Sequence, residues 1–312
     1  MSDFQAMAQA YAQAGGDPAA LTSPAMATMV VSGNKVLGAR TVPGIEFSSE
    51  ELAHGIKAEI RVLPRTRLAM PVHLCFGVLP THGLQEILAT YEIGEDADVT
   101  FLAHCTFPNA VQVRHLMSAT LHVARNARLR YTEAHFHGPE GGVEVRPTAH
   151  VVVDEGGQFL TTFSLVKGRA GVVTLDYAVD VAERGVADLT TRIMGSGRDQ
   201  IKVAETIRLN GPAARGVARA RLALSGEAAG EVVGTTEGNA PETRGHIDCI
   251  EIVRDRARAH AVPIVRVSDP QAQVTHEAAI GTVNRKELET LMARGLDEEA
   301  AVDMIVRGML AG

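Results

Sequence analysis

The sequence predicts a mainly β fold with short helical segments at both ends. Short runs rich in Val, Ile, Leu and Thr recur between Gly, Asn and Asp residues from about Pro24 to Gly281. This pattern is typical of strands joined by tight turns. Strands do not alternate with long helical stretches, so a doubly wound α/β fold is not favoured. A sandwich, a barrel, a propeller and a β-solenoid all remain compatible with the pattern.

The spacing of chemically distinctive residues favours the solenoid among these folds. The interval from Cys75 to Cys105 equals that from Cys105 to His135, and the interval from Cys249 to Glu277 is only two positions shorter. A solenoid coil takes roughly 20–30 residues, and adjacent strands lie about 4.8 Å apart. We therefore expect these residues to stack on neighbouring coils and to share a ligand, although the sequence shows no clear repeat.

Helical segments are expected before and after the strand region. Residues from Ser2 to Gln13 are rich in Ala and lack β-branched residues, and a Gly pair that can end a helix follows them. Near the C-terminus, Asn284 and Glu287 have the spacing of a capping box at the start of a helix.

A second C-terminal helix is expected to start at Asp297, with acidic residues in its first turn, where the helix dipole favours negative charge. This helix carries an apolar stripe made of Val302, Ile305, Val306 and Met309. Two interpretations stay open: the helix pair packs on the strand domain, or it docks a partner.

Composition and charge limit the function classes. A length of 312 residues with 46% apolar residues is sufficient for a large packed core. The net charge of −7 gives no strong attraction to nucleic acid. The N-terminus lacks the features of a signal peptide, and no apolar run has the length of a membrane span. With 3 cysteines, a disulfide scaffold is not expected, and we predict a reducing, cytoplasmic location.

One candidate site follows from a period-two pattern in Y-T-E-A-H-F-H-G-P-E. Glu133, His135 and His137 share one strand face with apolar neighbours, so that face is expected to point inward. A buried Glu with two His residues needs partners or a metal ion. Together with Glu140, the H-x-H pattern also resembles a cupin-type metal site, although H-x-H is common by chance and no second cupin motif follows.

A second candidate site centres on Cys249 in I-D-C-I-E-I-V. A strand here puts Cys249 and Glu251 on one face, and only one residue of the His276–Glu277 pair can share it. Thiolate suits iron and sulfur chemistry, with imidazole or carboxylate completing an open site. One cysteine cannot hold a cluster alone, so a labile or dimer-shared cluster is expected. A buried free cysteine is otherwise an inert small hydrophobe, which is the interpretation favoured for Cys75.

Longer strings of residues carry a family resemblance. They are G-H-I-D-C-I-E-I-V, V-T-H-E-A-A-I-G and R-G-L-D-E-E-A-A-V-D-M-I-V-R-G, and more loosely P-V-H-L-C-F-G-V, H-C-T-F-P-N-A and Y-T-E-A-H-F-H-G-P. At these residues the chain resembles the SufB/SufD core-domain family, the scaffold proteins of SUF iron–sulfur cluster assembly. It is most similar to the short form of minimal systems.

The resemblance implies a right-handed parallel β-helix with helical ends. It divides the chain into an N-terminal helical segment (1–23), the core domain (24–283) and a C-terminal segment (284–312) that docks a SufC-type ABC ATPase. It implies a homodimer formed through C-terminal strands, a transient iron–sulfur cluster, a sulfur donor and apo-protein recipients. The chain itself is expected to be a scaffold and not an enzyme, and the sequence has no phosphate-binding G-x-x-x-x-G-K-[ST] motif.

The resemblance also assigns roles to individual residues. The sulfur acceptor and relay cysteines are Cys105 and Cys249, and the cluster ligands are Cys249 with Glu277 or His276. The lining of the sulfur path falls on Glu133, His135 and His137. His135 and His137 depart from the Gln and Trp of SufB, and the Arg and Asn at the start of the path are replaced around Gly77 and Leu79. The route or donor of sulfur is therefore expected to differ.

Two alternative functions stay open. One is a cupin-like metalloenzyme that uses His135, His137 and Glu140. The other is a SufD-like platform that dimerises and engages the ATPase without a cluster of its own, although the presence of Cys249 argues against it.

Overall fold

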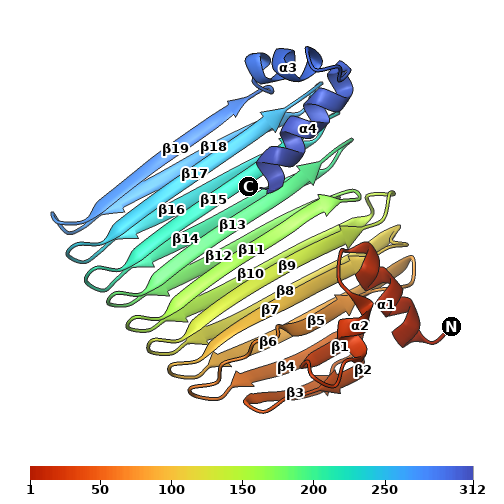
Figure 1. The fold of residues 1–312 in the computed structure, drawn as a ribbon, viewed down its shortest axis with the longest axis vertical. Helices are drawn as coiled ribbons and strands as arrows, with labels where there is room; N and C mark the ends of the chain where they lie inside the picture. Colours follow the sequence, from red (N-terminus) through yellow and green to blue (C-terminus); the bar gives the residue numbers. More distant parts are fainter. Residues whose placement is uncertain (312) are drawn as a thin grey trace.

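Over residues 1–311, which the computed structural model describes, the chain forms a parallel β-solenoid of about eight turns with helices at both ends (Figure 1). Two sheets face each other, and successive strands alternate between them through the body of the solenoid. The predicted β-helix core is therefore confirmed. Each strand crosses the molecule once before a turn carries the chain to the other sheet, which explains why the apolar runs are short.

The ten-stranded sheet contains the odd-numbered strands from β5 onward together with β1 and β2. Its order is β19 (Gln273–Gly281), β17 (Arg244–Val253), β15 (Arg215–Leu224), β13 (Val186–Gly195), β11 (Gln158–Lys167), β9 (Arg128–His137), β7 (Asp98–Phe107), β5 (Val72–Gly77), β1 (Thr28–Ser32) and β2 (Lys35–Arg40). The nine-stranded sheet has the order β18 (Arg258–Val267), β16 (Ala229–Gly238), β14 (Gln200–Leu209), β12 (Val172–Val181), β10 (Val143–Val153), β8 (Gln112–Val123), β6 (His82–Ile93), β4 (Gly55–Val62) and β3 (Ile45–Glu51).

The length of a coil varies along the solenoid. The coil that pairs Gln158 with Val186 is two positions shorter than the coil that pairs Asp98 with Arg128. Because side chains alternate between faces with a period of two, a coil that is one position shorter or longer reverses which residues stack. Similar spacing along the sequence therefore does not by itself put two side chains on the same face.

The predicted stacking is confirmed for one pair in this region and wrong for the other. Cys105 lies directly opposite His135. Cys75, however, pairs with His104, while Phe76 pairs with Cys105, because this coil is one position shorter than the interval between the two cysteines. Cys105 thus points into the solenoid, and Cys75 points to the outer face.

Alternating burial defines the interior. In β9 every second residue from Leu129 to His137 is buried, and the residues between them are partly exposed. One continuous cluster of buried apolar side chains extends from Ala27 to Cys249 and fills the space between the sheets. This interior holds the candidate functional residues described below.

A turn with one left-handed residue recurs where the chain passes from the second sheet to the first. Only Gly156 among these residues is a glycine. The recurring position is occupied by Asp96, Asn126, Gly156, Arg184, Ala213 and Glu242, all with φ between 55° and 66°. The backbone thus repeats while the residue type varies, so the sequence shows no clear repeat.

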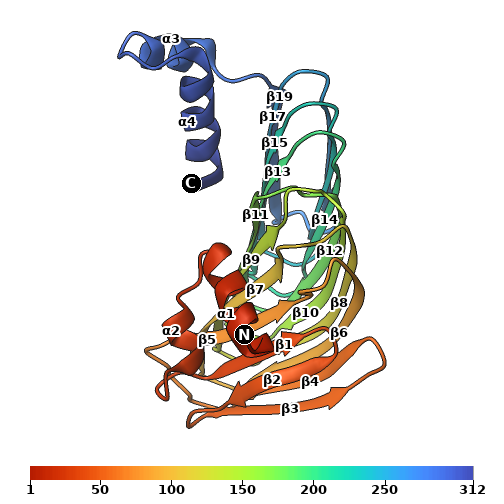
Figure 2. The same ribbon diagram turned by 90° about the vertical axis from the view of Figure 1, so that its right-hand side faces the viewer.

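The N-terminal helices cover the outer face of the ten-stranded sheet (Figure 2). The predicted first helix is confirmed as α1 (Asp3–Gln13), and Ser2 forms a capping box with Gln5. A short helix, α2 (Pro18–Thr22), follows. Helix α1 packs on β1, β5 and β7 and buries Cys75 in a small apolar cluster with Met7 and Tyr11.

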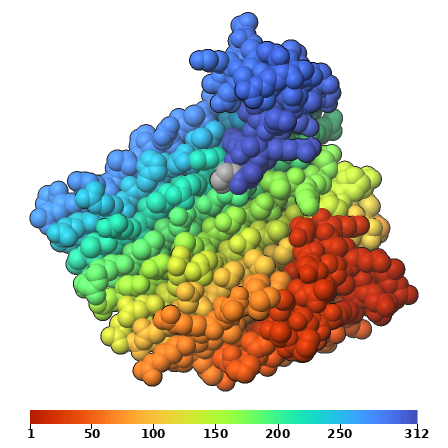
Figure 3. All heavy atoms as spheres, in the orientation of Figure 1, coloured from red at the N-terminus to blue at the C-terminus, as the bar shows by residue number. Residues whose placement is uncertain are grey.

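The C-terminal helices lie on the same side of the molecule as α1. Asn284 caps α3 (Arg285–Met292) through its side chain, as predicted, and Asp297 accepts a hydrogen bond from the Ala300 N–H in α4 (Glu298–Ala311). Helix α4 contacts β15. Both helical ends stand out from this face, and the strands in the middle of the chain lie exposed between them (Figure 3).

The last coil, β18 and β19, is uncovered. The apolar side chains of Val265, Val267 and Ile280 belong to the inward-facing rows of these strands, yet they are 39%, 51% and 48% exposed. No further coil packs on this end within residues 1–311. Among the same residues, no helix has the length and apolar character needed to span a membrane.

Candidate functional site

Three candidate residues meet inside the N-terminal half of the solenoid. The Cys105 Sγ atom lies 3.9 Å from Glu133 Oε1, and His135 Nε2 lies 2.6 Å from the same oxygen. All three residues are buried. They come together because β7 and β9 place Cys105 opposite His135 and Glu133 precedes His135 by two positions on the same face. We call Cys105, Glu133 and His135 the N-terminal polar cluster.

A hydrogen-bond chain fixes the tautomers of the two histidines. His137 Nδ1 lies 3.1 Å from the carbonyl oxygen of Arg169 and 3.2 Å from that of Ala170, so this nitrogen donates. His137 Nε2 then accepts from His135 Nδ1 at 3.4 Å. A neutral His135 consequently presents the lone pair of Nε2 toward Glu133.

Burial determines the protonation of this cluster. It raises the pKa of Glu133 to about 7 and lowers the pKa of His135 to about 3. It also raises the pKa of the Cys105 thiol well above its usual range, and the Glu133 charge adds to this effect. The proton between Glu133 and His135 therefore resides on the carboxyl group, and Cys105 is a thiol when nothing else is bound.

A second buried carboxyl group lies midway along the interior. The Thr191 hydroxyl donates to Glu205 Oε1 at 2.7 Å and links the two sheets. Burial raises the pKa of Glu205 to about 7. Between this pair and the N-terminal polar cluster stands the buried ring of Phe163, which is directly opposite both Glu133 and Thr191 on neighbouring strands.

The third group is near the C-terminal end of the solenoid. Cys249 and Glu251 both point inward from β17, as predicted, and both are buried. Neither carboxylate oxygen of Glu251 has a hydrogen-bond partner in the described part of the chain. Burial and the nearby Glu251 and Glu205 raise the pKa of Cys249 to about 12, and burial raises the pKa of Glu251 to about 7.

The His276–Glu277 pair divides between the two faces of β19. Cys249 lies opposite Ala278, so the predicted stacking of Cys249 with Glu277 is wrong: this coil is one position longer than the interval between them. His276 shares the inward face with Cys249 and is its diagonal neighbour, at a Cα separation of roughly 7–8 Å. Glu277 points outward beside Asp248, which is ion-paired with Arg221.

The structure does not bring together the residues of the cupin-type alternative. His135 and His137 are buried, whereas Glu140 lies exposed in the turn after β9. The chain reverses at that turn and carries the carboxylate away from the interior. A site made of these three residues is therefore absent.

Comparison with known proteins identifies the family. The family model for the SufBD core domain of the SUF system of FeS cluster assembly matches residues 89–309. The chain belongs to the SufBD family. The matched range contains the N-terminal polar cluster, Cys249, α3 and all but the last two residues of α4.

Similar SufBD proteins cover nearly the whole chain. An iron–sulfur cluster assembly SufBD family protein of Methanocaldococcus jannaschii is 37% identical over 282 residues, 90% of this chain and 89% of that protein. One of Pyrococcus horikoshii is 32% identical over 310 residues, 99% of this chain and 94% of that protein. The iron–sulfur cluster assembly protein SufB of Bacillus subtilis is 25% identical over 232 residues, 70% of this chain but 47% of SufB.

Glu205 and His115 are buried in this SufBD core, and neither was predicted from the sequence. Glu205 follows Ile201 and Val203 in the alternating pattern of β14, and His115 occupies an inward position of β8 between Val113 and Met117. The sequence signal for both residues is a polar side chain at a position where the alternation of the strand calls for an apolar one. Neither ring nitrogen of His115 has a hydrogen-bond partner over the described range, and burial lowers its pKa to about 3.

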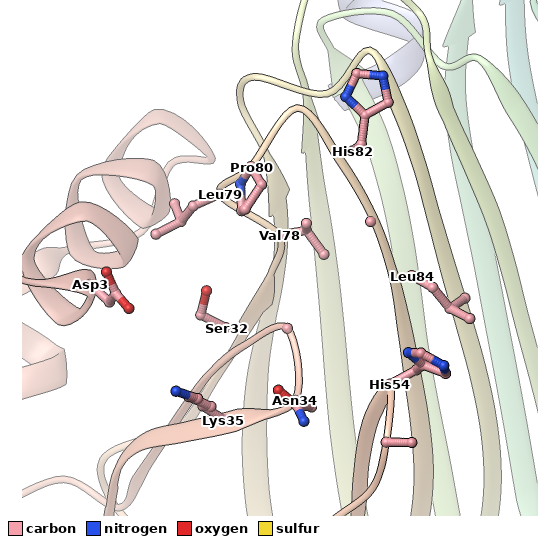
Figure 4. A pocket seen from close by; sticks show the side chains of 13 residues that line it. Asp3, Ser32, Asn34, Lys35, His54, Val78, Leu79, Pro80, His82 and Leu84 are labelled. Carbon is pink, nitrogen blue, oxygen red and sulfur yellow. The ribbon is translucent and has the colours of Figure 1, made fainter.

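A pocket of about 580 Å³ opens beside α1 at the N-terminal end of the solenoid (Figure 4). The β1–β2 turn and the segment after β5, including Leu79, form its walls, and Lys35, His54 and His82 contribute polar groups. Gln85 lies behind it, buried, and donates to the carbonyl oxygens of Gly33 and Gly77.

Proposed function

We propose that this SufBD protein is a scaffold that accepts sulfur and builds a labile iron–sulfur cluster at a homodimer interface. The observation that carries the proposal is the position of Cys249 beside Glu251, one coil from the uncovered end of the solenoid. A thiol and an unpartnered carboxyl group face the same interior space there. Both groups are ligands for iron once they are deprotonated.

A second copy of the chain would complete the ligand set. Each protomer offers one cysteine, fewer than the four thiolates that clusters commonly use. His276 faces the interior at the uncovered end, and two-fold symmetry duplicates every ligand at such an interface. The exposed apolar residues of the last coil support pairing through this end, because the unpaired backbone groups of an edge strand can bind another chain. Glu277, on the outer face of the edge strand, is proposed as a ligand that acts across the interface.

The proposed energy source is a SufC-type ABC ATPase bound to the C-terminal helices. A groove of about 380 Å³ between α3 and α4 is lined by Leu291, Met304 and Ile305, with Lys286 and Glu287 at its rim. An apolar groove with a charged rim suits a protein partner. ATP hydrolysis in the partner would then shift the dimer and open or close the cluster site.

The sulfur route is proposed to begin near the pocket beside Leu79 and to include Cys105. The pocket adjoins the end of β5, whose Phe76 lies opposite Cys105. The buried Phe163 interrupts the polar interior between Cys105 and Cys249, which supports the expectation that the route differs from that of larger scaffolds. Direct supply of sulfide to Cys249 is the simpler variant of the same function.

Cluster transfer tests the scaffold function. Protein reconstituted anaerobically with iron and sulfide should convert an added apo-ferredoxin to its holo form, because a labile site releases its cluster to a protein with a full ligand set. The ferredoxin visible spectrum and iron content after re-isolation measure the transfer. Free iron and sulfide at matched concentration provide the control. A dimer that binds no cluster, or never releases one, would instead favour a SufD-like platform.

Partner capture tests the role of the C-terminal helices. Wild type should retain a purified SufC-type ATPase on a column, and deletion of residues 284–312 should abolish retention. Met304→Lys, which puts a charge into the exposed α3–α4 groove without removing a buried residue, should reduce ATPase affinity by about 10-fold or more. Equal retention by all three proteins would contradict this docking site.

A further inference from the structure

We propose that the N-terminal polar cluster binds one divalent transition-metal ion through Cys105, Glu133 and His135. The site is separate from the proposed cluster site at Cys249. One ligand atom from each residue, the thiol sulfur, a carboxylate oxygen and a ring nitrogen, lies within 4.8 Å of the other two. All three residues are buried, so the site is enclosed by protein.

The spacing of the ligand atoms suits a metal ion with tetrahedral coordination. Metal–ligand bonds of about 2.0–2.3 Å separate neighbouring ligand atoms by roughly 3.3–3.8 Å. The Cys105 Sγ to Glu133 Oε1 distance of 3.9 Å is close to this range. The 2.6 Å contact between Glu133 Oε1 and His135 Nε2 has to open by less than about 1 Å, which a side-chain rotation of Glu133 provides.

The histidine is held in the tautomer that a metal needs. Metal-binding histidines usually donate their other ring N–H to a fixed acceptor, which orients the ring. His135 makes this bond to His137, and His137 in turn donates to the backbone carbonyl groups of Arg169 and Ala170. This series of hydrogen bonds orients the Nε2 lone pair of His135 toward the space shared with Glu133 and Cys105.

Charge also favours an ion of charge +2. Thiolate and carboxylate together carry −2, which a divalent cation neutralises, so the loaded site is neutral inside an apolar core. Without the ion, two anions less than about 4 Å apart in a buried site would repel, and both groups keep their protons. Binding therefore replaces two protons by one metal ion. The bound ion would also hold Cys105 as a thiolate, the form that reacts with sulfur compounds.

Two sources of a fourth ligand lie near Glu133. A cavity of about 30 Å³ lies there, bordered by Tyr131, Thr161 and Tyr177, and this volume holds a water molecule or a similarly small ligand. The unpartnered ring of His115, whose centroid is 6.0 Å from that of His135, is a second source of a ligand. Sulfur, nitrogen and oxygen ligands with an open position suit Zn²⁺ or Fe²⁺.

Co²⁺ is the probe for the experiment, since thiolate coordination gives it a charge-transfer absorption band. The titration uses metal-free, reduced Cys249→Ser protein, which lacks the thiol of the proposed cluster site. We expect one Co²⁺ per chain, a thiolate band and displacement of Co²⁺ by Zn²⁺. In this background, Cys105→Ser should abolish the band, and Glu133→Gln and His135→Ala should each weaken Co²⁺ binding by about 100-fold or more.

Two matched variants and a fold check complete the design. Cys75→Ser removes the cysteine on the outer face and should leave the titration unchanged. His122→Ala removes a partly exposed histidine that lies between Glu92 and Asp154, and it should remove only weak binding without a thiolate band. Glu133→Gln keeps the shape of the side chain, so its thermal unfolding shows whether the fold is intact.

The outcomes separate this site from the proposed scaffold function. A thiolate band that persists in the double variant Cys249→Ser, Cys105→Ser would overturn the proposal, as would no Co²⁺ binding to a folded Cys249→Ser protein. Cluster transfer by the wild type can succeed or fail independently of both results.

Discussion

Buried acidic residues distinguish the interior of this solenoid from an apolar core. Glu133, Glu205 and Glu251 lie on inward-facing rows, and burial raises the pKa of each to about 7. Of these, Glu205 has a hydroxyl donor and Glu251 has no partner within residues 1–311. A carboxyl group that is kept neutral near pH 7 can release its proton when a cation arrives. This property suits a protein that handles metal and sulfur.

The Glu205→Gln variant tests the protonation of the interior. Its amide oxygen still accepts from Thr191, but the side chain no longer titrates. Burial raises the folded pKa of Glu205 from 4.5 to about 7, so its stabilisation of the fold is complete below pH 4.5 and is lost as pH rises through 7. Relative to wild type, the variant should gain up to about 3 kcal/mol in unfolding free energy between pH 4.5 and pH 8.

Urea unfolding across this pH range measures the gain. Glu50→Gln, at an exposed position of β3, is the matched control and should follow the wild type. Parallel stability curves for wild type and Glu205→Gln would mean that Glu205 is ionised in the folded protein, contrary to the account given above.

At the scale of the strand, register decides which residues meet. Glu133, His135 and His137 share one inward face, as predicted, because alternation within a strand depends only on local geometry. The prediction for Cys249 and Glu277 is wrong, because register between coils depends on coil lengths that differ by one or two positions along the solenoid. This coil is one position longer than the interval between Cys249 and Glu277. Glu277 therefore lies on the outer face, and His276 shares the inward face with Cys249.

The edge strand β19 makes a specific prediction about assembly. Ile280→Lys places a charge on an apolar, half-exposed position at the uncovered end. If two copies pair through this end, the charge is buried without a partner and should weaken the homodimer by about 10-fold or more. Light scattering during size-exclusion chromatography gives the mass. Met304→Lys, on α4, should remain dimeric, and an equally dimeric Ile280→Lys would exclude this interface.

At the scale of the whole molecule, helices lie at both ends of the chain, and the last coil of the solenoid is uncovered. Capping patterns at Asn284 and Asp297 allowed the C-terminal helices to be predicted from sequence, since caps are local signals. The uncovered end could not be predicted in the same way, because Ile280 and Val267 look like ordinary core residues until the packing of the coils is known. We propose that this end is the surface through which a second copy of the chain completes the cluster site.

The central claim is that Cys249 anchors the cluster, and anaerobic reconstitution tests it most directly. Wild type, Cys249→Ser and Cys75→Ser are each treated with iron and sulfide, desalted and assayed for iron and acid-labile sulfide per chain. Wild type and Cys75→Ser should load equally. Cys249→Ser should lose most of its acid-labile sulfide and keep no more iron than the one ion per chain of the site at Cys105, while it still unfolds cooperatively on heating. Equal loading of Cys249→Ser and wild type would contradict the account.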